Sequence, residues 1–123
     1  MLVDIHESDD RGNVYTLREP GGLAIFWAGL SLTVPEGFES DGASVPRFFW
    51  RAVFPPGDTR ALRAAFCHDF IYRTHPLGWM RTDADSLFLE LLLEHGTPFF
   101  RALLAYIGVR LFGRIAWKRG GAA

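Results

Sequence analysis

The pattern that most constrains the fold is a change in the spacing of apolar residues near residue 45. Before this point the apolar segments are short, and the turn sequences EPGG, AG and PEG separate them. This predicts short strands joined by tight turns, over residues 14–17, 22–27 and 30–34. Beyond it, helical spacing predicts helices over residues 60–73, 83–95 and 99–118. We expect an α+β fold: a small antiparallel β meander, then a helix hairpin and a third C-terminal helix.

Residues with known capping preferences set the expected helix ends. Asp58 or Thr59 is expected to cap the first helix, and Thr82 the second. Gly96, with Pro98 just beyond, is expected to end the second helix.

Length and composition fit a single domain over residues 1–123, with a β-rich part at 1–45 and a helical part at 46–119. The chain is 49% apolar and 22% charged, which suits a globular core. A net charge of −1 gives no general attraction to nucleic acid. We expect no secretory signal and no membrane-spanning helix, because no apolar run is long enough. The single cysteine, Cys67, excludes an internal disulfide and is expected to pack as a small apolar residue.

The segment AAFCHDFIYRT, residues 64–74, places a polar trio on a predicted helix. At about 100° per residue, His68, Asp69 and Tyr72 lie on the side opposite Arg60 and Arg63. His68 and Tyr72 are four residues apart and therefore neighbours on the helix surface. The alanines beside them would let another helix approach closely.

The next predicted helix carries an acidic residue on its apolar side. Its polar stripe is expected to be solvated and consists of Asp83, Ser86, Glu90 and Glu94. Asp85 instead falls with Phe88 and Leu92. A carboxylate buried without a partner is costly, so we expect Asp85 to meet His68 or Tyr72 across a helix hairpin.

Simpler interpretations of the same residues remain open. Asp85 follows Thr82 by three residues and fits the acidic position of a capping box. His68 fits a hydrogen-bonded core histidine, and Asp69 fits a surface ion pair with Arg73.

Four separated motifs resemble a family of small, uncharacterised phage and prophage proteins, the domain of unknown function DUF1353. They are LTVPEGFESDGASVPRFFW, AAFCHDFIY, RTDADSLFLELLLEHG and AYIGVRLFGRIAW, in that order over nearly the whole chain. The resemblance implies a viral or prophage origin and no established activity. It implies a place in the host cytoplasm or in the phage particle, with phage proteins or further copies of the chain as partners.

The motifs AAFCHDFIY and ADSLF also resemble the catalytic helix pair of phospholipase A2, most closely its disulfide-free version in parvovirus capsid proteins. This resemblance covers about a third of the chain. It implies that His68 is the general base, that Asp85 orients it and that Tyr72 hydrogen-bonds Asp85. It also implies that Asp69 is a ligand of a Ca²⁺ cofactor and that the substrate is a lipid ester at a membrane surface.

The calcium loop of phospholipase A2 is rich in glycine, whereas this chain has FPPGDT with Gly57 alone. Asp41 and the Gly42 backbone in SDGAS are alternative oxygen donors. In the same loop Ser44 fits the N-cap of a short helix over residues 46–53, so a ligand loop and a capping turn both remain open.

The last predicted helix is apolar but rich in cations. These are Arg101, Arg110, Arg114, Lys118 and Arg119. Since Arg110 and Arg114 share a face, we favour a core helix with a basic end. A helix lying on an anionic membrane and an oligomerisation surface are the alternatives.

Two functional hypotheses follow. In the first, the chain is a metal-assisted ester hydrolase that uses His68, Asp85, Asp69 and Tyr72. In the second, it is a structural or assembly protein of a phage, and the same residues form a buried hydrogen-bond network.

Overall fold

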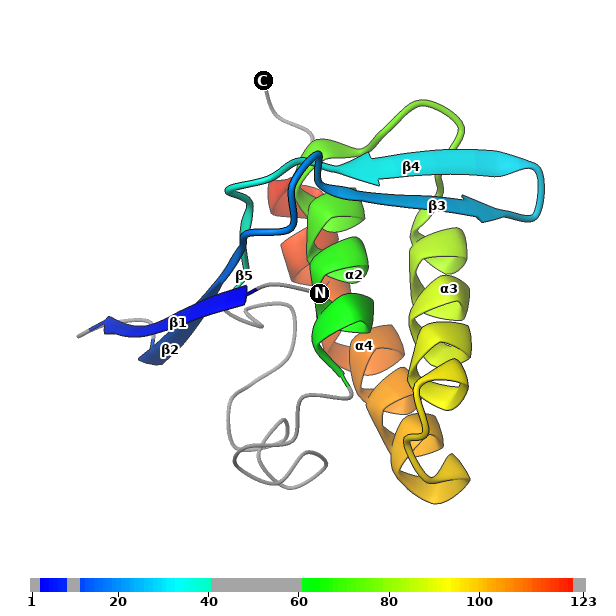
Figure 1. Cartoon of the computed structure of the whole chain (residues 1–123). Helices are drawn as coiled ribbons and strands as arrows, with labels where there is room; N and C mark the ends of the chain where they lie inside the picture. Colours follow the sequence, from blue (N-terminus) through cyan, green and yellow to red (C-terminus); the bar gives the residue numbers. More distant parts are fainter. Residues whose placement is uncertain (1–2, 9–11, 41–60, 121–123) are drawn as a thin grey trace.

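The computed structural model describes residues 3–8, 12–40 and 61–120. Antiparallel strands precede three helices in these residues (Figure 1), so the α+β prediction is confirmed. The strands are β1 (Val3–Ser8), β2 (Gly12–Leu17), β3 (Leu23–Trp27), β4 (Leu30–Val34) and β5 (Glu39–Ser40). The helices are α2 (Leu62–Thr74), α3 (Arg81–Glu94) and α4 (Phe99–Arg119). The expected helix over 46–53 and the expected caps Ser44, Asp58 and Thr59 lie outside the described residues.

The strands form two sheets, and the prediction of one meander is wrong in this respect. In the described residues β2 pairs with β1 and β5, whereas β3 and β4 form a separate hairpin. Gly22 stands between β2 and β3 with φ +83°, and a Cβ there would lie 2.3 Å from the carbonyl oxygen of Val34. Only glycine fits both the conformation and the space, so the chain can turn away from β2 here.

β1 has no counterpart among the predicted strands. Its sequence, VDIHES, is acidic and short of apolar residues, which is a weak strand signal. It nevertheless pairs with β2 along its whole length, from Val3 opposite Leu17 to Ser8 opposite Gly12. Pairing with a neighbouring strand therefore outweighs the weak local preference.

The β3–β4 hairpin packs on the helices through alternate residues. Leu23, Ile25, Leu32 and Val34 are buried and belong to the same apolar core as α2 and α3. Trp27, at the end of β3, stacks on Trp79 with 6.0 Å between ring centroids. The Trp27 indole N–H also donates a hydrogen bond to Glu90 of α3, which ties the tip of the hairpin to that helix.

The structure confirms only one of the two predicted ends of α3. Met80 is the N-cap and its N–H donates to Asp83 at 2.9 Å, so Thr82 lies inside the helix and the predicted cap is wrong. The capping-box interpretation of Asp85 is wrong for the same reason. At the other end Gly96 has φ +90°, and the Thr97 N–H donates to the Leu92 carbonyl, which is a Schellman motif. The prediction that Gly96 ends the helix is confirmed.

Small residues let α4 pack closely beside α2 and α3 (Figure 1). Its buried positions are Ala102, Ala105, Gly108, Val109 and Gly113. This face lies in the core, as expected, whereas large side chains elsewhere on the helix are exposed. No helix in the described part of the chain is long and apolar enough to cross a membrane.

The two-residue turn between β3 and β4 provides a test of backbone strain. Ala28 and Gly29 have φ of 51° and 81°, a conformation that favours asparagine or glycine at the first position. Ala28→Asn should therefore raise the free energy of unfolding by about 1 kcal/mol. Chemical denaturation measures this, with Ala24→Asn in the adjoining strand as control. Equal effects of the two substitutions would contradict this account of the turn.

Candidate functional site

The candidate site centres on the carboxylate of Asp85, which is fully buried on α3. Its Oδ1 lies 2.7 Å from Nε2 of His68 and accepts a hydrogen bond of 2.6 Å from the Tyr72 hydroxyl. Its Oδ2 accepts a hydrogen bond of 2.7 Å from Arg110 of α4. The predicted meeting of Asp85 with His68 and Tyr72 is therefore confirmed, and all three helices contribute to the site.

Helical spacing on α2 aligns the two donors to Oδ1. His68 and Tyr72 are one turn apart, and their rings lie 4.1 Å apart between centroids. Phe88 of α3 packs against the His68 ring at 4.8 Å. Gly113 of α4 makes room for the Tyr72 hydroxyl, because a Cβ there would lie only 2.7 Å from its oxygen.

Arg81 and Arg110 belong to the site but were absent from the predicted set. Arg81 donates to the Tyr72 hydroxyl at 3.1 Å and to the backbone carbonyls of Val109 and Arg110 at 2.9 and 2.7 Å. Its Nε lies 3.9 Å from Asp85 Oδ2. The spacing of four residues between Arg81 and Asp85 could have predicted their contact, since such residues are neighbours on a helix. The sequence contains no comparable pattern that links Arg110 to Asp85. Arg110 contacts Asp85, whereas Arg114, on the same predicted face, is exposed.

Asp69 lies on the other side of the His68 ring. Its carboxylate is 5% exposed and accepts a hydrogen bond from the Ser40 hydroxyl at the end of β5. The closest carboxylate oxygen lies 3.9 Å from Nδ1 of His68. Asp69 is therefore buried and not at the surface as the sequence-based pairing with Arg73 assumed, while the positive charge of Arg73 helps to lower its pKa. His68 therefore has one carboxylate on each side.

The charges of the site stabilise one another. Burial lowers the pKa of His68, but the bonds and charges of Asp69 and Asp85 outweigh it, so the pKa lies above the ordinary value. Burial raises the pKa of Asp85, but the bonds from His68, Tyr72 and Arg110 outweigh it and lower the pKa. Burial likewise raises the pKa of Asp69, and its contacts with His68 and Ser40 bring it below the ordinary value. The geometry thus favours an imidazolium between two carboxylates.

The described residues do not make up a calcium site. Among residues 3–8, 12–40 and 61–120, no three His, Cys, Asp or Glu side chains are grouped to hold a metal ion. Ca²⁺ takes six to eight oxygen ligands, and Asp69 supplies the one carboxylate of the predicted set. The other predicted ligand and loop residues lie outside the described residues: Asp41, Gly42, Ser44 and Gly57.

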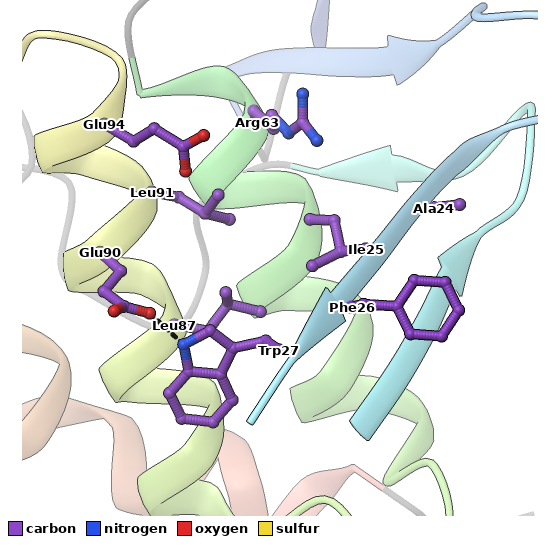
Figure 2. Close-up of a pocket in the computed structure, with 9 residues that line it drawn as sticks. All are labelled: Ala24, Ile25, Phe26, Trp27, Arg63, Leu87, Glu90, Leu91 and Glu94. Carbon is purple, nitrogen blue, oxygen red and sulfur yellow. Dashed lines mark hydrogen bonds between the residues drawn. The ribbon is translucent and has the colours of Figure 1, made fainter. Parts of the chain in front are cut away.

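A hollow of about 390 Å³ lies between β3 and α3 (Figure 2). Its lining includes Trp27, Glu90 and Glu94, and none of the site residues. His68 itself is 2% exposed.

Cys67, next to His68, has no chemical role in this arrangement. Its side chain is fully buried, and burial raises the pKa of its thiol to about 12. It therefore packs as an apolar residue, as predicted.

A known protein family matches most of the region that contains the candidate site. A family model described as "Protein of unknown function (DUF1353)" matches residues 27–109, which is more than half of the chain. The chain belongs to the DUF1353 family. The matched region of this DUF1353 member contains β4, α2, α3 and the residues His68, Asp69, Tyr72 and Asp85.

One relative of this DUF1353 member is an uncharacterised protein, y4jT, of Sinorhizobium fredii (strain NBRC 101917 / NGR234). The two are 32% identical over 87 residues, which cover 69% of this chain and 25% of y4jT. The chain thus spans about a quarter of that relative. No solved structure matches the present chain.

Arg110 and Arg114, both on α4, provide a matched test of the Asp85 network in this DUF1353 member. Arg110→Met removes the hydrogen bond to a buried carboxylate and should lower the free energy of unfolding by about 2 kcal/mol. Arg114→Met, at an exposed position, should change it by less than about 0.5 kcal/mol. Chemical denaturation of both variants measures the difference. Equal losses would show that Arg110 does not support Asp85.

The pKa shifts predict how stability depends on pH. His68, with its raised pKa, stabilises the fold fully below about pH 6.5 and loses this contribution as pH rises through the folded-state value. Asp69 and Asp85, with lowered pKa values, contribute above about pH 3.9 and lose it as pH falls. The network should therefore stabilise most between about pH 4 and 6.5.

Thermal unfolding across this range tests the sign. The unfolding midpoint should fall as pH rises above about 6.5, and His68→Gln should remove that fall. His95→Gln, at an exposed position, should keep it. A fall that persists in His68→Gln would assign the pH dependence to other groups.

Proposed function

We propose that this DUF1353 member is an ester hydrolase for lipids in which His68 activates water. The observation that carries the proposal is the contact of 2.7 Å between Nε2 of His68 and Oδ1 of the buried Asp85. A carboxylate in this position fixes the ring and its tautomer, with the proton on Nε2. The Nδ1 atom, on the side of Asp69, is then the one that takes up a proton.

The chemistry requires a neutral His68 at the start. The water oxygen bonds to the ester carbonyl carbon while its proton passes to Nδ1. Asp85 stabilises the resulting imidazolium. Collapse of the tetrahedral intermediate breaks the bond to the alcohol oxygen, and the imidazolium returns the proton to that oxygen. Because the pKa of His68 is raised, hydrolysis should increase with pH through that value.

A calcium ion would polarise the ester carbonyl, with Asp69 and Asp41 as the proposed ligands. Asp69 is the described member of this pair, and the described residues alone do not hold the ion. The proton transfers through His68 therefore do not depend on the calcium ion.

Hydrolysis of phospholipid with purified protein tests the proposal. The wild type should release fatty acid, and His68→Gln should lower the rate about 100-fold or more. His95→Gln, with an equally altered but remote side chain, should keep the rate. Parallel assays with Ca²⁺ and with a chelator test the proposed cofactor.

A correctly folded wild type without esterase activity would overturn the proposal, as would a fully active His68→Gln. Unfolding midpoints of the variants identify any loss that comes from misfolding.

Burial favours a second candidate, a phage structural or assembly protein without catalysis. His68 is 2% and Asp85 0% exposed, and Asp85 has hydrogen-bonding contacts with His68, Tyr72 and Arg110. Such a network stabilises the arrangement of α2, α3 and α4. The phage origin rests on the motif resemblance, which would place the protein in the host cytoplasm or in the particle. This candidate predicts unstable His68 variants and a wild type without esterase activity.

A further inference from the structure

Large apolar side chains line up along the outward side of α4. The exposed members of this outward face are Phe100, Ile107, Leu111 and Ile115, which lie along one side of the helix. Phe100, Leu111 and Ile115 are 71%, 70% and 63% exposed. The fully buried positions of α4 are mostly small residues, although Trp117 also packs against Tyr72 and His75.

Positive charge flanks this outward face. The helix contains Arg101, Arg110, Arg114, Lys118 and Arg119 and no acidic residue. Arg110 is engaged with Asp85. Arg114, Lys118 and Arg119 are exposed, and two of them stand in the last turn. The whole chain has a net charge of −1, so this concentration of cations is local.

The charge distinguishes between two occupants of the face. A second copy of the chain, packed through the same face, would bring two sets of cations together without an acid on either helix. An anionic lipid surface would accept the apolar side chains among its acyl chains and pair the cations with its phosphates. We propose that the outward face of α4 rests on an anionic lipid bilayer, with the helix axis parallel to the surface.

This surface stands apart from His68 and does not depend on the proposed hydrolysis. If the chain is also an esterase, bilayer binding would bring it to its substrate. Binding and hydrolysis can therefore fail separately.

Sedimentation with lipid vesicles tests the proposal. The vesicles contain ether-linked phosphatidylcholine, alone or with about 30% ether-linked phosphatidylserine, so that hydrolysis cannot alter them. The wild type should bind the anionic vesicles and bind at least about tenfold more weakly in 0.5 M salt or without phosphatidylserine.

The double variant Leu111→Glu/Ile115→Glu should bind these vesicles at least about tenfold more weakly than the wild type. A matched control is Ile5→Glu/Phe26→Glu, which adds the same charge at exposed apolar positions on β1 and β3. It should bind within about twofold of the wild type if the α4 face is responsible. Since all four positions are exposed, both variants should keep the unfolding midpoint.

Three outcomes would overturn the proposal. They are a wild type that does not bind anionic vesicles, equal losses in the two double variants, and a dimer in solution that Leu111→Glu/Ile115→Glu dissociates. The last result would assign the face to a second copy. His68→Gln should bind as the wild type does, which separates this test from that of hydrolysis.

Discussion

The buried carboxylate of Asp85 requires donors from every helix around it. A charge in an apolar interior is tolerated only when hydrogen bonds and opposite charges replace the lost water. His68 and Tyr72 supply them from α2 and Arg110 from α4. The positions of the three helices are therefore coupled through the Asp85 side chain. Its donors can reach it only if the helices pack closely. Gly113, for example, leaves room where the Tyr72 hydroxyl must approach α4.

The same network is suited to chemistry and to structure. A histidine with its Nε2 held by a buried carboxylate has a fixed orientation, which general-base catalysis needs. The raised pKa of His68 and the lowered pKa of Asp85 also mean that the charged pair stabilises the fold. One group can thus contribute to stability in its protonated form and would act as a base in its neutral form. Membership of a family of unknown function leaves both roles as proposals.

Much of the site could be predicted because its members are close in sequence. The spacing of four residues between His68 and Tyr72 and the apolar surroundings of Asp85 predicted their meeting across a short connection. Arg110 is 25 residues from Asp85, and helical spacing contains no information about which α4 residue faces α3. β1 and the division into two sheets were missed for the same reason, because strand pairing is decided between segments. The DUF1353 match supports the family part of the prediction, and its phospholipase part remains a proposal.

The sequence by itself determined the succession of strands and helices, the end of α3 at Gly96 and the inward position of Asp85. These follow from local backbone preference and from apolar spacing within one element. Only the tertiary structure decided that Arg81 and Arg110 complete the site, and that α4 buries mainly small residues while Phe100, Leu111 and Ile115 stay exposed. Such choices depend on which surfaces meet, and that is set by the packing of several elements at once.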